Sequence, residues 1–264
     1  MFYPVLFVSL LAFQGTLCEE EEIDGEFALK YLSDYHYISQ SRSGNHDITT
    51  AIKNFQGFFG LPVTGQLDEE TIYQMKKPRC GVADVDENGE RVRVKRYSTW
   101  GKWRKTDLKY YMTYGEDMSH DDQSRIIAQA FKMWSDVAPK LKFSRTNSIS
   151  DANFRISFGK GTHAGVPGER RCSSKFDGKG KVLAHAFYPE DGRLHFDEDD
   201  YFTETGSFWN GSQSLIYVAV HEIGHALGLR HSDVKGSVMW PTASRGTPKL
   251  HQDDIAGIRS IYGR

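Results

Sequence analysis

Apolar residues recur at helical spacing in three short stretches near the start of the chain. These stretches run from Glu26 to Tyr37, from Asp47 to Phe59 and from Asp68 to Lys76. Turn-forming residues separate the second from the third, including Leu61-Pro62-Val63-Thr64-Gly65. The pattern predicts a small segment of three helices.

A longer pattern of helices and strands follows downstream. Ser119 to Val137 predicts a long helix, because Ser119 and Asp122 form a capping box and an apolar stripe faces one side. Short apolar or alternating runs predict strands. The strands are expected at Leu108–Met112, Lys142–Arg145, Asn153–Phe158, Val182–Phe187 and Arg193–Phe196. Two more helices are expected, one capped by Ser212 and carrying His221, the other over Asp253–Tyr262. The predicted fold class is α+β. One mixed five-stranded sheet and three helices are expected to follow the three-helix segment in the sequence.

Composition and charge are those of a globular protein and do not suggest a fibrous or disordered one. The 264 residues are 39% hydrophobic and 26% charged, which is typical of globular domains. A net charge of -2 gives no reason to expect nucleic acid or an anionic membrane as a partner.

The first 18 residues are typical of a secretory signal. Val5–Phe13 is a short apolar core, and Thr16-Leu17-Cys18 places small residues where a signal peptidase cuts. An uncleaved anchor is the alternative, but the core is too short to span a bilayer, and no later segment reaches the necessary length. Cleavage would leave Cys80 and Cys172 in an exported chain.

A basic motif suggests a second processing site. Arg93-Val94-Lys95-Arg96 fits the R-x-K-R pattern of furin-type convertases and follows a polar, turn-prone stretch. The alternative is a solvated basic patch. Cleavage after Arg96 would divide the exported chain into a prosegment, 19–96, and a mature domain, 97–264.

The run from His221 to His231 carries the most specific chemistry. His221 and His225 are four residues apart, so one helical face presents both imidazoles to a zinc ion. Glu222 lies beside them as the general base for an attacking water. Gly228 permits a turn after the helix that brings His231 back as third ligand, which leaves one metal position open. The alternative is a helix whose histidines only pack or face water.

Cys80 fits the open position. A thiolate is a strong zinc ligand, and Cys80 in Pro78-Arg79-Cys80-Gly81-Val82-Ala83-Asp84 could displace the water needed for hydrolysis. Arg79 and Asp84 are close enough in sequence to pair across the turn. The prosegment would then keep the enzyme inactive. Without the zinc motif, a bystander or disulfide cysteine would be the simpler interpretation.

These motifs together resemble the matrix metalloproteinase family, from Glu26 to the end of the chain. Met239 looks like the Met-turn of the wider metzincin group, an apolar floor beneath the metal. The resemblance implies a secreted, monomeric zinc endopeptidase of the extracellular space or matrix, acting on matrix proteins such as collagen or on cell-surface proteins. It also implies tissue metalloproteinase inhibitors as partners. Because the sequence ends at Arg264, a short matrilysin-like member without a hemopexin domain is expected.

The resemblance further implies a structural zinc site and a calcium site between residues 161 and 201. The residues it assigns are His185 and His195 to zinc, and Asp177, Asp197, Asp200 and the carbonyls of Gly178, Gly180 and Val182 to calcium. The chain departs from the family upstream, where seven extra residues separate His163 from Phe176-Asp177-Gly178 and Cys172 stands in place of an aspartate. The expected zinc set is therefore His163, Cys172, His185 and His195. Two alternatives stay open: a site of two histidines with low occupancy, and a Cys172 that is free or paired with Cys80 in misfolded material.

Substrate contacts follow from the same resemblance. An extended peptide is expected to add to the strand at Val182–Phe187 through backbone groups of Leu183 and Ala184. Tyr217 would make the S1′ pocket shallow and suited to small or medium aliphatic residues, with Pro241 in its wall. Ala243 replaces the family's tyrosine in this wall, and Ala83 replaces its proline in the switch.

The chain also carries one candidate modification site and leaves one alternative function open. Asn210-Gly211-Ser212 is a glycosylation sequon. An inactive zinc-binding interaction module is the alternative function, and the presence of Glu222 favours the enzyme.

Overall fold

The computed structural model describes residues 24–38, 47–86 and 100–263, which form two compact units. Unit 1 holds the described residues up to Lys76, and unit 2 holds those from Lys77 onward. The motif around Cys80 therefore belongs to the same unit as the histidine run. Within the described ranges, every helix is too short or too polar to cross a membrane.

Unit 1 contains the three expected helices. They cover residues 24–34, α2 (Ile48–Phe59) and α3 (Glu69–Met75). Asp47 and Asp68 cap α2 and α3 by accepting hydrogen bonds from backbone N–H groups of the first turn. The first helix ends before Tyr37, its predicted last residue, because the backbone turns and His36 takes a positive φ of 64°. Aromatic rings pack the first helix and the turn after it against α2, with Tyr31 and Tyr37 both edge-on to Phe55.

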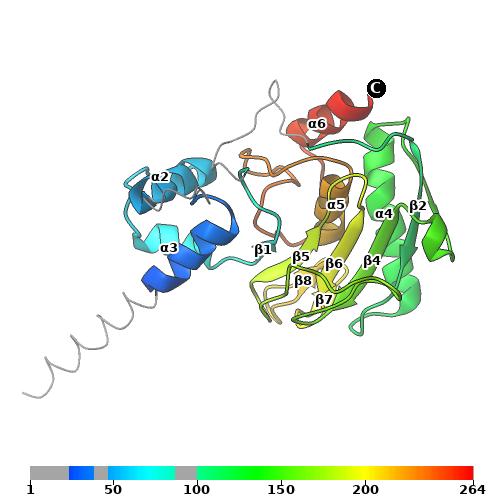
Figure 1. The fold of residues 1–264 in the computed structure, drawn as a ribbon, viewed down its shortest axis with the longest axis horizontal. Helices are drawn as coiled ribbons and strands as arrows, with labels where there is room; N and C mark the ends of the chain where they lie inside the picture. The colour runs from blue at the N-terminus through cyan, green and yellow to red at the C-terminus, as the bar shows by residue number, and fades with distance from the viewer. Residues whose placement is uncertain (1–23, 39–46, 87–99, 264) are drawn as a thin grey trace, which may run out of the picture. The chain divides into compact units, whose positions relative to one another are not determined.

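Unit 2 is an α+β domain built on one mixed sheet (Figure 1). Its strand order is β1-β5-β6-β4-β2-β3, with β5 antiparallel to β6 and the other neighbours parallel. The strands are β1 (Arg79–Cys80), β2 (Asp107–Met112), β3 (Lys142–Arg145), β4 (Phe154–Gly159), β5 (Val182–Ala186) and β6 (Arg193–Asp197). Strands β2 to β6 are the five that were expected. The sixth, β1, was not foreseen and comes from the switch motif.

Three helices accompany the sheet, as expected. They are α4 (His120–Val137), α5 (Leu215–Ala226) and α6 (Gln252–Tyr262). The smaller elements are η1 (Ile149–Asp151), β7 (Phe202–Thr203) and β8 (Gln213–Ser214), and the last two pair with each other. Ser119 caps α4, as expected, because its side chain accepts a hydrogen bond from Asp122 N. Its hydroxyl also donates to the Asp122 carboxylate, a contact between side chains that differs from the reciprocal backbone bond of a capping box.

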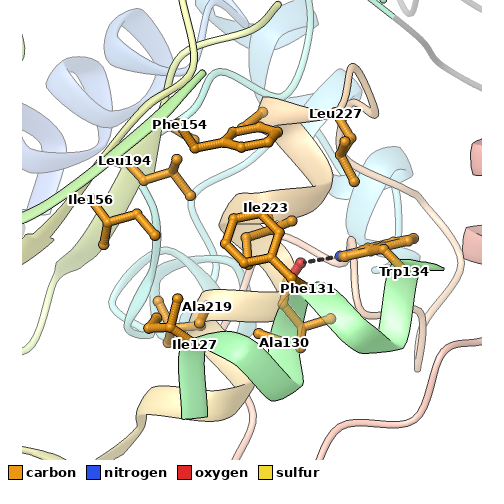
Figure 2. Close-up of a cluster of buried hydrophobic side chains, with 14 of the residues drawn as sticks. Ile127, Ala130, Phe131, Trp134, Phe154, Ile156, Leu194, Ala219, Ile223 and Leu227 are labelled. Carbon is orange, nitrogen blue, oxygen red and sulfur yellow. Dashed lines mark hydrogen bonds between the residues drawn. The ribbon is translucent and has the colours of Figure 1, made fainter. Parts of the chain in front are cut away.

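The core lies between the sheet and the helices α4 and α5 (Figure 2). Phe131 and Trp134 of α4 pack with Ile223 of α5, and Phe154 and Leu194 contribute from the sheet. The indole N–H of Trp134 donates to the carbonyl of Val220 at 2.9 Å, so the polar edge of this buried ring is satisfied. This core fixes α5, the helix that carries the zinc motif.

Candidate active site and metal clusters

Helix α5 places His221, Glu222 and His225 in the interior. All of its residues are buried, and Ser214 caps it by accepting a hydrogen bond from Tyr217 N at 3.2 Å. The prediction that Ser212 caps this helix was wrong, since residues 213–214 pair as a strand and the helix starts only at Leu215.

The turn after α5 depends on Gly228. Its φ is 105°, and a Cβ there would lie 2.4 Å from the carbonyl oxygen of Gly101. Only glycine fits this conformation and this contact. The turn returns His231 to the histidines of the helix.

The three imidazoles converge through their Nε2 atoms. The Nε2 of His221 lies 3.1 Å from that of His225 and 3.2 Å from that of His231. Nitrogen ligands about 2 Å from a tetrahedral zinc are about 3.3 Å apart, so the spacing fits this ion. The outer nitrogens of His221 and His225 are hydrogen-bonded at 2.7 Å to the carbonyls of Val238 and Leu229. Because each Nδ1 then carries the proton, each Nε2 lone pair faces the other rings.

Burial controls the ionisation of this cluster. It lowers the pKa of His221 to about 3 and the pKa of His225 well below its usual value, which keeps both rings neutral, as metal ligands must be. Burial raises the pKa of Glu222 to about 8. A carboxyl shifted toward neutral pH is suited to take up and release a proton.

Cys80 completes the cluster. Its Sγ and one nitrogen from each of His221, His225 and His231 all lie within 4.8 Å of one another. Burial and the neighbouring Glu222 raise the pKa of the thiol in the metal-free protein. A bound cation would favour the thiolate instead. The four donors match a closed tetrahedral zinc site.

Backbone hydrogen bonds hold the switch on both sides. Arg79 N and Gly81 N donate to the carbonyls of Lys181 and Ala184 at 2.9 and 2.8 Å. On the opposite side, Cys80 N donates to the carbonyl of Pro241 at 3.0 Å. The switch thus occupies the edge of β5, which was predicted to bind substrate.

A buried ion pair braces the switch, as the sequence predicted. Arg79 contacts both oxygens of Asp84 through its terminal nitrogens, at 2.6 and 3.0 Å. The same carboxylate lies 2.8 Å from Nδ1 of His231, a contact that the sequence did not reveal. Burial alone would raise the pKa of Asp84, but Arg79 and His231 hold it well below its usual value. Asp84 is therefore anionic.

A small pocket opens beside the cluster. Leu183, Tyr217, Val218, Pro241 and Ala243 contribute to its lining, so the residues predicted for the S1′ wall do meet. The Tyr217 hydroxyl donates to the carbonyl of Ser237 at 3.4 Å.

Met239 lies directly against the zinc helix. A Cβ on Gly224 would lie 2.4 Å from its sulfur, so the glycine admits the thioether. Asp254 fixes this turn by accepting hydrogen bonds from Val238 N and Met239 N at 2.9 and 3.1 Å.

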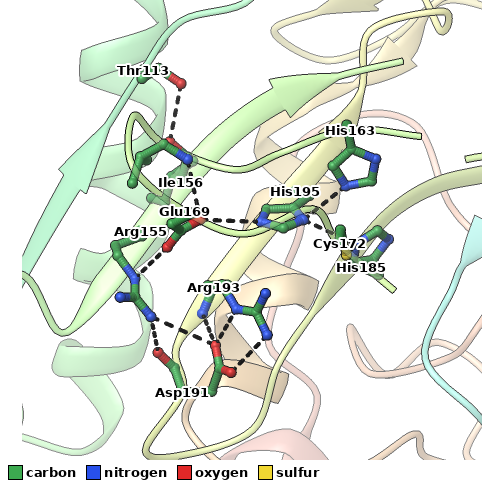
Figure 3. Close-up of polar contacts among 11 residues, drawn as sticks. Thr113, Arg155, Ile156, His163, Glu169, Cys172, His185, Asp191, Arg193 and His195 are labelled. Carbon is green, nitrogen blue, oxygen red and sulfur yellow. Dashed lines mark hydrogen bonds and ion pairs between the residues drawn. The ribbon is translucent and has the colours of Figure 1, made fainter. Parts of the chain in front are cut away.

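A second cluster contains His163, Cys172, His185 and His195, whose donor atoms also lie within 4.8 Å of one another (Figure 3). The Nδ1 of His195 lies 2.9 Å from His163 Nε2 and 3.2 Å from His185 Nε2, and Cys172 Sγ lies 3.3 Å from the latter nitrogen. These spacings again suit a tetrahedral zinc. Cys80 and Cys172 are both free of disulfide bonds in the folded chain.

The residues expected to bind calcium lie in one region. Gly180 N and Val182 N donate to the carboxylates of Asp200 and Asp177 at 2.8 and 3.1 Å. One oxygen each of Asp197 and Asp200 is buried without a hydrogen bond from any described residue. Burial raises the pKa of these two carboxyls to about 6 and about 7. Buried oxygens without partners fit a hard cation such as calcium.

The remaining predicted sites are those for glycosylation and for processing. Asn210 is exposed, as a glycosylation site requires. The signal segment 1–18 and the convertase motif Arg93, Lys95 and Arg96 lie outside the described residues.

Comparisons with known proteins agree with the geometry. Residues 102–263 match the family described as Matrixin, and residues 26–75 match a putative peptidoglycan binding domain. The chain is 44% identical to matrix metalloproteinase-18 of Xenopus laevis over 82% of its length and 44% of that protein. It is 39% identical to interstitial collagenase of Sus scrofa, over 95% of the chain and 52% of the relative. It is 37% identical to matrilysin of Homo sapiens, over 92% of the chain and 87% of the relative.

Fold and site together define a zinc hydrolase domain, which follows a helical prosegment in the sequence. The chain belongs to the matrixin family of zinc-dependent metalloendopeptidases. It spans about half the length of several of the relatives that it matches.

Proposed function

We propose that the chain is a secreted, zinc-dependent endopeptidase made as a zymogen. The observation that carries this proposal is the convergence of three neutral imidazoles beside the buried Glu222, with Cys80 on their remaining side. An inactive binding module would need neither the carboxylate nor a cysteine to cover the metal. No feature of the described residues favours that alternative.

His221, His225 and His231 would hold the zinc. When bound, the ion supplies a Lewis acid that polarises the scissile carbonyl and lowers the pKa of water. Glu222 removes the proton from the attacking water at its carboxylate oxygen and delivers it to the amine nitrogen of the leaving product. Burial raises the pKa of Glu222, which makes its carboxylate a stronger base toward the attacking water.

Substrate would take the place of the switch. An extended peptide at the β5 edge can donate to the carbonyls of Ala184 and Pro241, which the switch uses in the zymogen. Tyr217 and Leu183 then limit the neighbouring pocket to small or medium aliphatic side chains. The substrate class proposed is extracellular matrix proteins, collagen among them, or cell-surface proteins.

Activation would follow cleavage after Arg96 by a furin-type convertase. Once the prosegment is cut from the mature domain, the switch can leave the site and withdraw Cys80 from the three histidines. Removal of a leader at residues 1–18, glycosylation of Asn210 and binding of tissue metalloproteinase inhibitors belong to the same proposal. So do a monomeric state and an extracellular location.

The second cluster would hold a structural zinc with Cys172 as thiolate ligand. Calcium would bind near Asp177, Asp197 and Asp200. Metal counting by mass spectrometry tests the zinc site, because Cys172→Ser should lower the zinc content from two ions to one per chain. An unchanged content would exclude the thiolate.

One experiment tests the enzyme itself. The full chain is treated with furin and offered a peptide library with and without a zinc chelator. We expect chelator-sensitive cleavage before aliphatic residues and a loss of at least about 100-fold in Glu222→Ala with zinc still bound. Activity that persists in Glu222→Ala, or a furin-treated chain that stays inert, would refute the proposal.

A further inference from the structure

Glu169, which belongs to the extra residues between His163 and Phe176, lies beside the second metal cluster. We propose that Glu169 is a positioning residue that orients His195 toward a metal in the cluster of His163, Cys172, His185 and His195. The inference rests on the second zinc site of the proposed function. Glu169 was not among the residues that the sequence indicated.

The two nitrogens of His195 have separate surroundings. Nδ1 faces the cluster, 2.9 Å from His163 Nε2, whereas Nε2 points toward Glu169 Oε2 at 3.9 Å (Figure 3). The Nε2 atom is buried, and no described residue hydrogen-bonds it. An imidazole that gives its Nδ1 lone pair to a metal keeps its proton on Nε2. This proton needs an acceptor, and Glu169 is the acid beside it.

Glu169 is itself fixed in place. Its Oε1 lies 2.7 Å from Arg155 Nε, and its Oε2 accepts a hydrogen bond from Val166 N at 3.2 Å. Arg155 in turn donates to the carbonyl of Asp191 at 3.1 Å. The side chain of Glu169 is only 10% exposed. A Cβ on Gly165 would lie 1.7 Å from Oε2, so the loop packs tightly over the carboxylate.

The present distance of 3.9 Å is longer than a hydrogen bond. A relative shift of about 0.7 Å between the His195 ring and the Glu169 carboxylate would bring the two atoms within hydrogen-bonding distance.

Charge supports the same arrangement. The three imidazoles are neutral ligands, so a Cys172 thiolate leaves one positive charge of Zn²⁺ unbalanced in a buried site. The carboxylate of Glu169 places negative charge beside His195, and Arg155 holds its other oxygen in position. Carboxylate–histidine–metal chains of this kind orient the ring and strengthen the ligand.

The test uses the full chain with Cys80→Ser and Glu222→Ala, which removes the thiol of the catalytic cluster and prevents self-cleavage. Into this background we place Glu169→Gln, which keeps the shape but loses the charge. Arg170→Gln, at an exposed neighbouring position, is the matched control. Cobalt titration followed by the thiolate absorption band reports on Cys172, and a zinc-binding dye measures the affinity of the second site.

We expect Glu169→Gln to bind the second ion about 10- to 100-fold more weakly and to alter the cobalt spectrum, while Arg170→Gln matches the parent. The metal-free proteins should unfold at the same temperature. The inference would be overturned if Glu169→Gln bound the second ion with the affinity of the parent and gave the same cobalt spectrum. It would also be overturned if Glu169→Gln lowered the unfolding temperature equally with and without metal, because the role of Glu169 would then be structural. A parent that binds only one ion would refute the second zinc site and this inference, leaving the catalytic proposal intact.

Discussion

The carboxylate of Asp84 lies 2.8 Å from Nδ1 of His231, so the prosegment holds one of the imidazoles that it covers. In the other two catalytic histidines the outer nitrogen meets a carbonyl of the mature domain. His231 differs from them because its outer nitrogen faces a carboxylate of the switch. In the proposed zymogen the switch would therefore supply a ligand in Cys80 and an orienting group in Asp84.

Asp84→Asn should weaken the lock. The change removes the carboxylate charge that lies 2.6 Å from the guanidinium of Arg79, a side chain that is only 2% exposed. Breaking a buried pair in this way typically costs about 3–5 kcal/mol. We expect the intact chain to cleave peptides before any convertase treatment, and a fluorogenic substrate measures this directly.

Two controls accompany this prediction. Asp151→Asn, at an exposed position far along the chain, should leave the intact chain silent. Adding Glu222→Ala to Asp84→Asn should abolish the new activity. If Asp84→Asn stays as silent as the parent, the pair does not stabilise the inhibited state.

Gly224→Ala should destabilise the catalytic unit. The added methyl would meet the Met239 sulfur at 2.4 Å and a ring atom of Trp134 at 3.0 Å. Overpacking of this kind typically costs about 1–3 kcal/mol. Denaturant unfolding of the zinc-loaded chain measures the loss.

A double mutant separates this clash from other effects. Met239→Ala removes the sulfur, so Gly224→Ala should cost less in that background than in the parent. Additive losses would show that the thioether is not what excludes a side chain at Gly224.

The elements of the fold were largely predictable because their signals are local. Helix α4 was expected from Ser119 to Val137 and runs from His120, with Ser119 as its cap. The zinc motif was equally accessible, since i, i+4 spacing and a glycine turn are written within eleven residues. Strand β1 was not predictable, because two residues become a strand only by pairing with β5, about a hundred positions away.

The contacts that were missed depend on how loops fold back. Asp84 was expected to meet Arg79, but its approach to His231 depends on the whole path of the switch. Glu169 likewise looked like one more charge in an insertion. Its role depends on Arg155 and His195, which lie on neighbouring strands β4 and β6.

Ser214→Ala should destabilise the start of the zinc helix. The hydroxyl of Ser214 accepts from Tyr217 N and lies 3.2 and 3.0 Å from the carbonyls of Glu204 and Gly246, so its loss leaves the buried Tyr217 N–H without this acceptor. Loss of a cap typically costs about 1 kcal/mol. We expect the unfolding midpoint in denaturant to fall, and Ser214→Thr, which retains a hydroxyl, to recover part of it. A midpoint unchanged by Ser214→Ala would contradict the assigned cap.

Removal of calcium should lower the stability of the catalytic unit. Asp197 and Asp200 each hold a buried oxygen without a described partner, and burial makes their charged forms costly. A cation at 100 times its dissociation constant stabilises the folded state by about 2.7 kcal/mol. A calcium-selective chelator should therefore lower the melting temperature of the zinc-loaded chain, and added calcium should restore it. Asp200→Asn should melt at a temperature that calcium no longer changes, whereas the exposed Asp151→Asn should respond like the parent. Equal calcium responses in the two variants would remove Asp200 from the site.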